Sequence, residues 1–208
     1  MAINTLYVDG GVLKSASRTF NNQNPRNIRL ERFFQPAIFK LLQKKLYHPS
    51  YKLKFHPYKY KYLTTKLKEI DSFLNGRYFD DLIKKILNIK KYKLKYEIRK
   101  FEAGNYTLLH DTEKEENGID FVIDISKINK IFDDAQNFSN SGISKDANKY
   151  FGGYTAYLTE SEELLKLTPS PNSISFVERK NQVLKYTKYF THQNKNTIVQ
   201  VAGTIIHK

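Results

Sequence analysis

The hydrophobic pattern of the chain changes its period near Tyr92. Before this point, apolar residues recur every three or four positions, which is typical of helices that bury one face. After it, apolar and polar residues alternate in short runs, and turn-forming Gly, Pro and Asn residues separate the runs, which is typical of strands. Helices followed by about seven short strands predict an α+β fold whose second half is a sandwich or a barrel.

The first half contains three segments with helical spacing, at residues 35–46, 64–74 and 78–87. We expect Pro36 in the first turn of the first helix, and Thr64 or Thr65 as the cap of the second. Residues 27–34 predict a strand that enters a helix. Residues 48–62 contain two prolines and predict a long loop or an irregular edge strand. Residues 1–27 are polar and predict an extended arm or loop, with one short strand at residues 6–8.

The second half contains the predicted strands, which we place at residues 92–101, 106–110, 119–125, 154–158, 173–177, 183–190 and 198–206. Residues 127–150 are polar and predict a long exposed loop. Glu160, Glu162 and Glu163 predict a short solvated helix or turn, and Gly152-Gly153 predicts a tight turn. We therefore expect an N-terminal arm at residues 1–27 and a single domain at 28–208, with helical support over about 28–91 and a barrel over about 92–208.

Charge divides the chain at nearly the same place. The whole chain has a net charge of +14. Residues 1–100 contain 23 Lys and Arg against 7 Asp and Glu, a net charge of +16, and residues 101–208 have a net charge of −2. A half-chain this basic predicts a polyanionic partner such as RNA or DNA. The alternative is a lysine-rich surface that serves only to solvate the protein.

Tyrosine and lysine interleave at residues 58–62 and 90–96. Basic residues can follow a nucleic-acid backbone while aromatic rings stack on bases, so the pattern supports nucleic-acid binding. The alternative is that the tyrosines pack on the barrel or on helices. We favour packing for Tyr92, Leu94 and Tyr96, because they alternate as in a strand.

The sequence contains no cysteine. Disulfide scaffolds, thiolate zinc sites and cysteine nucleophiles are therefore excluded, and a cytoplasmic location is expected. No apolar run approaches the length of about 18 residues that a transmembrane helix needs, and residues 1–10 show no pattern of a secretory signal. We therefore expect no membrane partner.

Metal chemistry in this chain must come from histidine and carboxylate side chains. His110 ends a predicted strand and is followed directly by Asp111. Together with a histidine from a later strand, such a pair can form a two-histidine, one-carboxylate site that leaves positions open on Fe(II). The alternative is a strand-end histidine beside a solvated acidic turn.

Residues 96–111 resemble the entry to the active site of iron- and 2-oxoglutarate-dependent oxygenases, in the prolyl-hydroxylase-like branch. In that family, an aromatic residue, a glycine and a strand precede a His-any-Asp metal motif. Other segments resemble the opening strand and helix and the later strands of the family, at residues 28–46, 119–125, 151–158, 169–176, 183–190 and 198–206. The resemblance implies a double-stranded β-helix, or jelly-roll barrel, supported by N-terminal helices.

The resemblance also implies which residues would bind the cofactors Fe(II) and 2-oxoglutarate. The metal ligands would be His110, Asp111 and His192. The 2-oxoglutarate would contact Tyr106 and Lys195.

The sequence departs from the family pattern at three positions. Thr112 stands where the motif has its aspartate, and Lys185 is the counterpart of the second histidine. Residues 198–203 contain no arginine to pair with 2-oxoglutarate, and Lys195 in the preceding turn is the nearest cation. A protonated lysine is not a metal ligand, and a loop lysine does not easily replace a buried carboxylate clamp.

Three hypotheses of function remain. We favour a catalytically degenerate relative that needs no cofactor and keeps the barrel as a binding module, docking on nucleic acid, an RNA-rich assembly or a protein partner, because a fold can outlast its site. The second is an active Fe(II)/2-oxoglutarate-dependent hydroxylase of a protein side chain, in which Glu113 is an alternative ligand to Asp111. The third is a basic nucleic-acid-binding protein of another fold.

Overall fold

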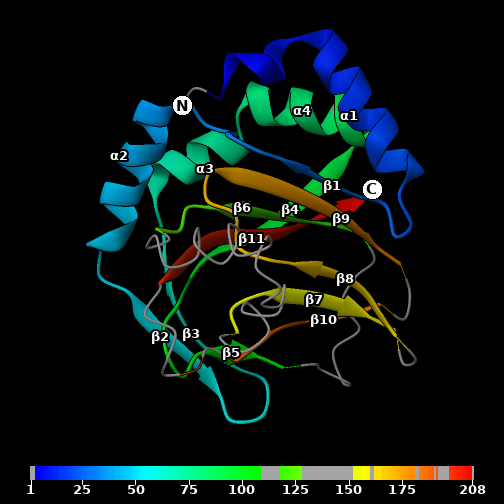
Figure 1. Cartoon of the computed structure of the whole chain (residues 1–208). Coiled ribbons are helices and arrows are strands. Elements are labelled where there is room, and N and C mark those ends of the chain that lie inside the picture. The colour runs from blue at the N-terminus through cyan, green and yellow to red at the C-terminus, as the bar shows by residue number, and fades with distance from the viewer. Residues whose placement is uncertain are drawn as a thin grey trace, which may run out of the picture.

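The structure is a computed structural model that describes residues 3–108, 118–127, 152–159, 162–180, 183–189, 191 and 197–207. In this part of the chain, helices lie against a curled β-sheet (Figure 1). The helices are η1 (Thr5–Val8), α1 (Gly10–Asn22), α2 (Pro36–Tyr47), α3 (Lys68–Leu74) and α4 (Arg77–Leu87). The strands are β1 (Asn27–Leu30), β2 (Lys52–His56), β3 (Tyr60–Thr65), β4 (Tyr92–Phe101), β5 (Tyr106–Thr107), β6 (Gly118–Asp124), β7 (Thr155–Leu158), β8 (Glu163–Leu167), β9 (Ser173–Arg179), β10 (Leu184–Thr187) and β11 (Ile198–His207).

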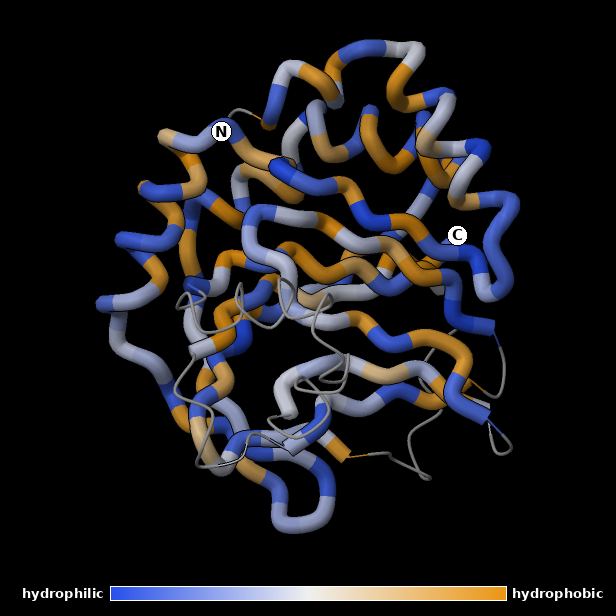
Figure 2. The backbone as a smooth tube through the Cα atoms, viewed as in Figure 1, coloured by the Kyte–Doolittle hydropathy of each residue, from blue (hydrophilic) through white to orange (hydrophobic). Residues whose placement is uncertain are grey.

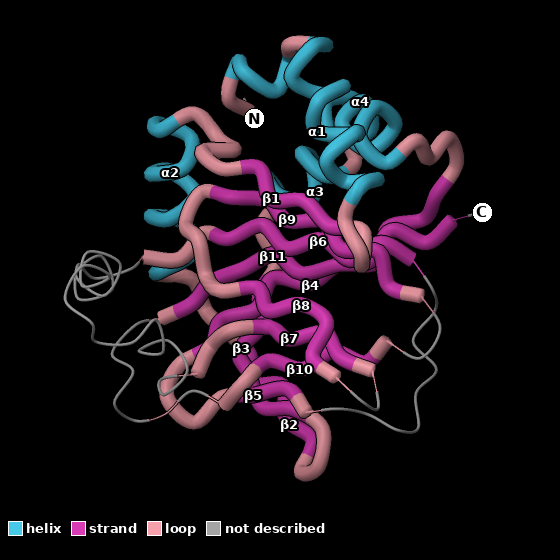
Figure 3. The backbone as a smooth tube through the Cα atoms, turned by 45° about the vertical axis from the view of Figure 1, so that its right-hand side comes forward, coloured by secondary structure: helices cyan, strands magenta, loops and turns pink. Residues whose placement is uncertain are grey.

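The described strands form one antiparallel sheet that curls into a half-barrel. Their order is β1-β9-β6-β11-β4-β3-β5-β10-β7-β8, and β2 pairs with β3. β6 and β10 are far apart in this order, but Lys185 Nζ of β10 lies 2.9 Å from Asp120 Oδ2 of β6. The sheet therefore curls until its two halves face each other, as the predicted jelly-roll barrel requires (Figure 3).

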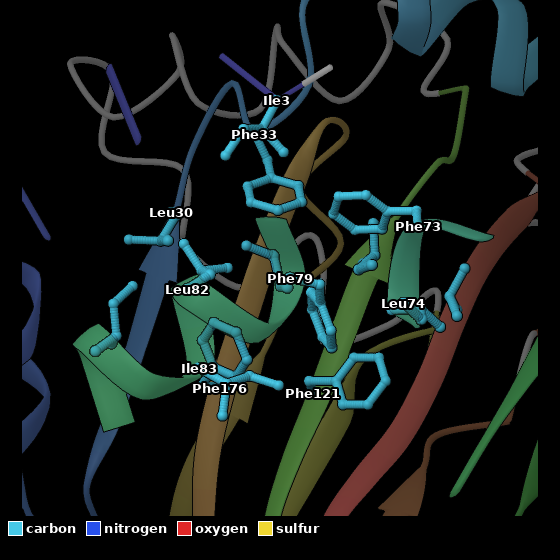
Figure 4. Close-up of a cluster of buried hydrophobic side chains, with 14 of the residues drawn as sticks. Ile3, Leu30, Phe33, Phe73, Leu74, Phe79, Leu82, Ile83, Phe121 and Phe176 are labelled. Atoms are coloured by element: carbon cyan, nitrogen blue, oxygen red, sulfur yellow. The ribbon is translucent and has the colours of Figure 1, made fainter. Parts of the chain in front are cut away.

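The main hydrophobic core lies between the helices and the larger half of the sheet (Figure 4). The ring of Phe79 in α4 lies 5.5 Å from the rings of both Phe121 in β6 and Phe73 in α3. Phe33 and Phe34, which follow β1, are fully buried in the same core. The core therefore holds the helices to one face of the sheet and leaves its other face for the barrel interior.

Strand alternation decides which side chains enter the barrel. Along β4, Leu94, Tyr96 and Ile98 belong to the helix-side core, as we expected for this alternating segment. Because successive residues point to opposite faces, Glu97 and Arg99 face the barrel interior. Figure 2 shows the same alternation of hydrophobic and hydrophilic residues along the strands. The interior of this barrel is therefore polar and charged.

The extended arm or loop predicted for residues 1–27 is wrong in its conformation, as is the strand at residues 6–8. Thr5–Val8 is a 3-10 helix and Gly10–Asn22 is an α-helix. Asp9 caps α1, since its Oδ1 accepts hydrogen bonds from the backbone N–H groups of Gly11 and Val12. Leu13, Ala16 and Phe20 are buried in the helix-side core. These three residues have helical spacing, but most other residues of the segment are polar, so the sequence pattern did not predict the helix.

Residues 48–65 form a hairpin rather than the predicted loop. β2 and β3 pair from Lys52 to His56 on one side and from Tyr60 to Thr64 on the other, so the edge-strand alternative for β2 is confirmed. Thr64 and Thr65 belong to β3 and do not cap α3, which begins at Lys68. The hairpin is stabilised by pairing between its two strands, and the spacing of apolar residues within each strand does not predict that pairing.

The first half therefore supplies β1, β2 and β3 to the sheet in addition to its helices, which corrects the boundary expected at about residue 92. Glu163 begins strand β8 and not a solvated helix, because β8 pairs with β7. The helices predicted at residues 35–46 and 78–87 are confirmed, with Pro36 in the first turn of α2. Residues 128–150 and Glu160 lie outside the described residues. Among the described helices, none combines the length and the apolar character needed to cross a membrane.

Candidate functional site

A cavity of about 1380 Å³ lies inside the barrel, between the two halves of the sheet. Residues of β4, β6 and β11 line one side of it, and residues of β7 and β10 line the other. Ala202 and Thr204 of the central strand β11 also line this cavity. It is the place where the charged faces of the strands meet.

Asp120 forms the first charged cluster in the cavity. Its side chain is only 2% exposed, and its Oδ2 lies 3.3 Å from Arg179 Nε of β9 and 2.9 Å from Lys185 Nζ of β10. Thr204 Oγ1 donates a hydrogen bond of 2.7 Å to Asp120 Oδ1. Three strands of one half of the sheet and one of the other therefore meet at a single carboxylate.

The electrostatics of this cluster keep Asp120 ionised. Burial alone opposes ionisation, but the positive charges of Lys185 and Arg179, with hydrogen bonds from Lys185 and Thr204, lower the pKa of Asp120 below its usual value. A buried carboxylate is tolerated when its charge is paired and its oxygens accept hydrogen bonds. This cluster meets both conditions.

Glu97 of β4 forms the second charged cluster. Its carboxylate accepts hydrogen bonds from Tyr62 Oη at 2.7 Å, Lys54 Nζ at 3.1 Å and Arg99 Nε at 3.2 Å. The guanidinium of Arg99 also lies 5.0 Å from the centre of the Tyr62 ring. Burial by itself would raise the pKa of Glu97. The hydrogen bonds and positive charges of these partners have the larger effect, so the pKa of Glu97 lies below its usual value.

Positive charge exceeds negative charge in the described lining of the cavity. The cationic residues are Lys52, Lys54, Lys66, Lys95, Arg99, Arg179 and Lys185, and the carboxylates are Asp71, Glu97 and Asp120. Seven cations against three carboxylates leave an excess of four positive charges.

The described cavity residues do not fit an iron ion. Lys185, which we predicted to stand in place of the second family histidine, lines the cavity and pairs with Asp120. Both Asp120 and Glu97 are already paired with cations. Among the described residues, histidine and carboxylate side chains do not gather in groups of three that could hold a metal.

Most of the residues predicted to bind cofactors lie outside the described residues. These are His110, Asp111, His192 and Lys195, together with Thr112 and Glu113, and their roles stay predictions. Tyr106 is described: its hydroxyl donates a 3.2 Å hydrogen bond to the carbonyl of Pro57, in the turn of the β2–β3 hairpin. Its neighbour Thr107 lines the cavity, where its Oγ1 accepts a hydrogen bond from the backbone N–H of Thr187.

Sequence reasoning missed Asp120, Arg179, Glu97 and Arg99 as members of a site. The signal was present in residues 92–101, where charged residues alternate with apolar ones. Charged positions of an alternating strand usually face solvent, and only the closure of the barrel turns them inward.

Comparison with protein families agrees with the fold and with the resemblance. A family model described as "Oxoglutarate and iron-dependent oxygenase degradation C-term" matches residues 1–205. The mouse protein "Prolyl 3-hydroxylase OGFOD1" is 32% identical over 100 residues, which cover 47% of this chain. That match spans only 15% of the length of the mouse protein.

Solved structures share the barrel. A prolyl-4-hydroxylase from Pseudomonas putida superposes with a TM-score of 0.61 at 9% identity, over 94% of this chain and 99% of that one. A prolyl hydroxylase from Trichoplax adhaerens, in complex with a peptide fragment of the hypoxia inducible factor oxygen degradation domain, superposes with a TM-score of 0.65 at 10% identity. This match covers 97% of this chain and 92% of that one. At such low identity the likeness concerns the fold, and it confirms the predicted double-stranded β-helix.

Proposed function

Because this chain belongs to the family described as "Oxoglutarate and iron-dependent oxygenase degradation C-term", we propose that it is a catalytically degenerate member of the prolyl-hydroxylase-like oxygenases that keeps the barrel as a binding module. The observation that carries this proposal is the pairing of Lys185 with Asp120. Lysine at the position of a metal-binding histidine removes a ligand and adds a positive charge that repels a metal ion.

The Asp120 cluster also opposes a return to metal binding. Lys185 Nζ already lies 2.9 Å from the buried carboxylate of Asp120. Turning it towards a metal ion would leave that carboxylate with one cationic partner fewer. The cluster is better suited to holding the two halves of the sheet together than to holding iron.

A titration with Fe(II) and 2-oxoglutarate under anaerobic conditions tests this proposal. A working site gives the weak visible charge-transfer band of a bidentate keto-acid complex, and an active prolyl hydroxylase measured in parallel provides the positive control. We expect no band from this chain. A band that disappears in His110→Ala would refute the proposal and favour the active hydroxylase.

We further propose that the β2–β3 hairpin binds single-stranded nucleic acid. The hairpin lies at the end of the barrel opposite α1 and α4 (Figures 1 and 3). Tyr58 in its turn is 83% exposed and Phe55 is 57% exposed, beside the exposed Lys52. Exposed aromatic rings among lysines can stack on bases while the lysines contact phosphates. Tyr62 is buried and is not available for stacking.

Binding of the full chain to a fluorescent single-stranded RNA at several salt concentrations tests this surface. We expect binding that weakens steeply with salt, since each phosphate contact releases counterions. Tyr58→Ala and Phe55→Ala should weaken it, whereas Tyr78→Ala, an aromatic residue on α4 that is 60% exposed, should not. Absent or salt-independent binding, or equal loss in all three variants, would overturn the nucleic-acid proposal.

A peptide is the other partner that the comparisons suggest, because the Trichoplax adhaerens enzyme is described with a peptide fragment. If a peptide partner rather than RNA uses the hairpin, unlabelled RNA should fail to compete with it. The cytoplasmic location expected from the lack of cysteine stays a prediction.

A further inference from the structure

We propose that a single nucleic-acid strand bound by the β2–β3 hairpin continues across the outer face of the sheet, over β3 and β5, to the residues that follow β10. Phe55, Lys61, Tyr106 and Tyr189 form this path, the outer row. The inference rests on the function proposed above for the hairpin, and it adds a second stacking place and a phosphate contact to that site. It stands on strand register, on exposure and on a lysine that lies between aromatic rings.

The register of the sheet places three side chains in one row. Phe55 of β2 pairs with Lys61 of β3, and Lys61 pairs with Tyr106 of β5. Residues that lie directly opposite each other in antiparallel strands point to the same face of the sheet. The row therefore presents an aromatic ring, an ammonium group and a second aromatic ring on one face.

This face is the outer one, turned away from the barrel cavity. Thr107, the neighbour of Tyr106, lines the cavity, and so does Lys54, the neighbour of Phe55. Because successive residues of a strand point to opposite faces, Phe55 and Tyr106 point outward. The 57% exposure of Phe55 agrees with this direction. A ligand on the outer row therefore does not need to enter the cavity.

Tyr189 extends the row beyond β5. β10 pairs with β5 at Thr187 and Thr107, which brings the residues after β10 next to Tyr106. The ring of Tyr189 lies 6.3 Å from the ring of Tyr106, and Tyr189 is 41% exposed. The row therefore has an aromatic surface at each end, with Phe55 at one end and the Tyr106–Tyr189 pair at the other.

Lys61 supplies a positive charge between these two ends. A Cβ atom at Gly104 would lie 4.0 Å from Lys61 Nζ and 3.9 Å from Tyr189 Oη, so the ammonium and the phenol approach the same turn. Within the part of the chain that the structure describes, the Lys61 side chain forms no ion pair and no hydrogen bond. The hairpin, from Lys52 to Thr65, contains four lysines and no Asp or Glu. The charge of Lys61 is therefore available to a phosphate.

The chemistry and the spacing of the row fit a nucleic-acid strand. Aromatic side chains on neighbouring strands of a sheet can stack on bases while lysines contact phosphates. Phe55 and Tyr106 lie two strands apart, about 10 Å at the backbone for strands spaced by about 4.8 Å. At about 3.4 Å or more per nucleotide, two or three nucleotides span this distance. A phosphate between two stacked bases would then lie over Lys61.

The row favours a single strand over a duplex. Paired bases stack on one another inside a double helix, so their faces are not open to side chains. Unpaired bases offer both faces, and stacking on them depends little on their sequence. We therefore expect the outer row to bind single-stranded RNA without strong sequence preference.

Binding of the full chain to a fluorescent oligouridine of about 12 nucleotides, measured over a range of salt concentrations, tests the outer row. Tyr189→Ala should weaken binding by about fivefold or more without changing its salt dependence, because stacking releases no counterions. Tyr189→Phe keeps the ring and should bind as the unmodified chain does. Equal losses in Tyr189→Ala and Tyr189→Phe would overturn the stacking role.

The salt dependence tests the phosphate contact. Lys61→Gln should reduce the slope of log affinity against log salt by about 0.7, the value for one phosphate on a single strand. Lys85→Gln is the matched control, because Lys85 is exposed on α4, at the end of the barrel opposite the hairpin (Figure 1). It should leave the slope unchanged, and equal changes in both variants would overturn the contact. Thermal melting checks folding, and if Tyr189→Ala does not fold, Lys61→Gln decides.

The outcomes separate the outer row from the hairpin proposal. If Tyr58→Ala weakens RNA binding but Tyr189→Ala and Lys61→Gln do not, the hairpin binds RNA and the outer row is overturned. If the unmodified chain binds no RNA, both proposals are overturned. Competition by duplex RNA or by polyglutamate as strong as that by unlabelled oligouridine would also overturn the row, because neither competitor offers unpaired bases.

Discussion

Lys185 Nζ of β10 lies 2.9 Å from Asp120 Oδ2 of β6, so a partly buried ion pair joins the two halves of the barrel. Arg179 of β9 approaches the same oxygen, at 3.3 Å. This arrangement makes the cluster a structural link between the two halves of the sheet. Its energetic role can be measured apart from any ligand.

A double-mutant cycle at Lys185→Met and Asp120→Asn should give a coupling free energy of about 1–3 kcal/mol in urea unfolding, because Asp120 is buried and the pair is hydrogen-bonded. The pair of Lys84 and Asp80 on α4 provides the control, since its atoms lie 2.6 Å apart but both side chains are exposed. The same cycle there should give roughly 0.5 kcal/mol or less. A coupling at Lys185 no larger than in the control would show that the cluster does not link the sheets.

The stability of the protein should fall in acid. The folded pKa values of Asp120 and Glu97 are lowered, despite burial, by their cationic partners. Their contribution is therefore fully present above their unfolded pKa values of about 4 and is lost as the pH falls through the lower folded values. Urea unfolding between about pH 3 and pH 7 should show this loss, and Asp120→Asn should make the curve flatter.

Asp124 acts in the opposite direction, because burial raises its pKa despite hydrogen bonds from Ser126 and Ser170. Its stabilising contribution is therefore greatest below its unfolded pKa and is lost as the pH rises through the folded value.

A curve for Asp120→Asn as steep as that of the unmodified chain would show that other groups cause the acid sensitivity.

Asn172 should be important for both backbone conformation and packing. It has a φ of 59°, a left-handed conformation that asparagine tolerates and alanine does not. Its side chain accepts a hydrogen bond from Phe34 N–H at 2.8 Å and donates one to Phe34 O at 3.0 Å. Asn172→Gly should lose only these bonds, and Asn172→Ala should cost about 1 kcal/mol more in chemical unfolding. Equal losses would argue against backbone strain.

Gly203 should not accept a side chain. A Cβ atom there would lie 2.5 Å from the carbonyl oxygen of Lys95 and 2.6 Å from the ring of Phe121. Gly203→Ala should therefore lower the free energy of unfolding by about 1–3 kcal/mol, as overpacking does. Gly10→Ala is the matched control, because nothing lies within 4 Å of its added Cβ. A tolerated Gly203→Ala, measured by thermal melting, would mean that β4 and β11 separate easily.

The sequence alone predicted the α+β class, the helices α2 and α4 and most strands of the barrel. These elements carry strong local patterns, such as Leu82, Ile83 and Ile86 on one face of α4. The strand β8 was missed and the pairing of β2 with β3 was not predicted, because cross-strand pairing stabilises these strands. Local spacing does not record such partners.

The sequence by itself also determined the family resemblance and the lack of thiol chemistry, and it predicted that Lys185 stands in place of a family histidine. Only the tertiary structure decided what that lysine does. Asp120 and Lys185 are 65 positions apart in the chain, and they meet because the sheet curls. Curling also turns the charged face of β4 inward, so residues that would be solvated on a flat sheet line a cavity. Burial lowers the effective dielectric constant around these charges and strengthens their interaction, and burial of this kind cannot be predicted from the sequence alone.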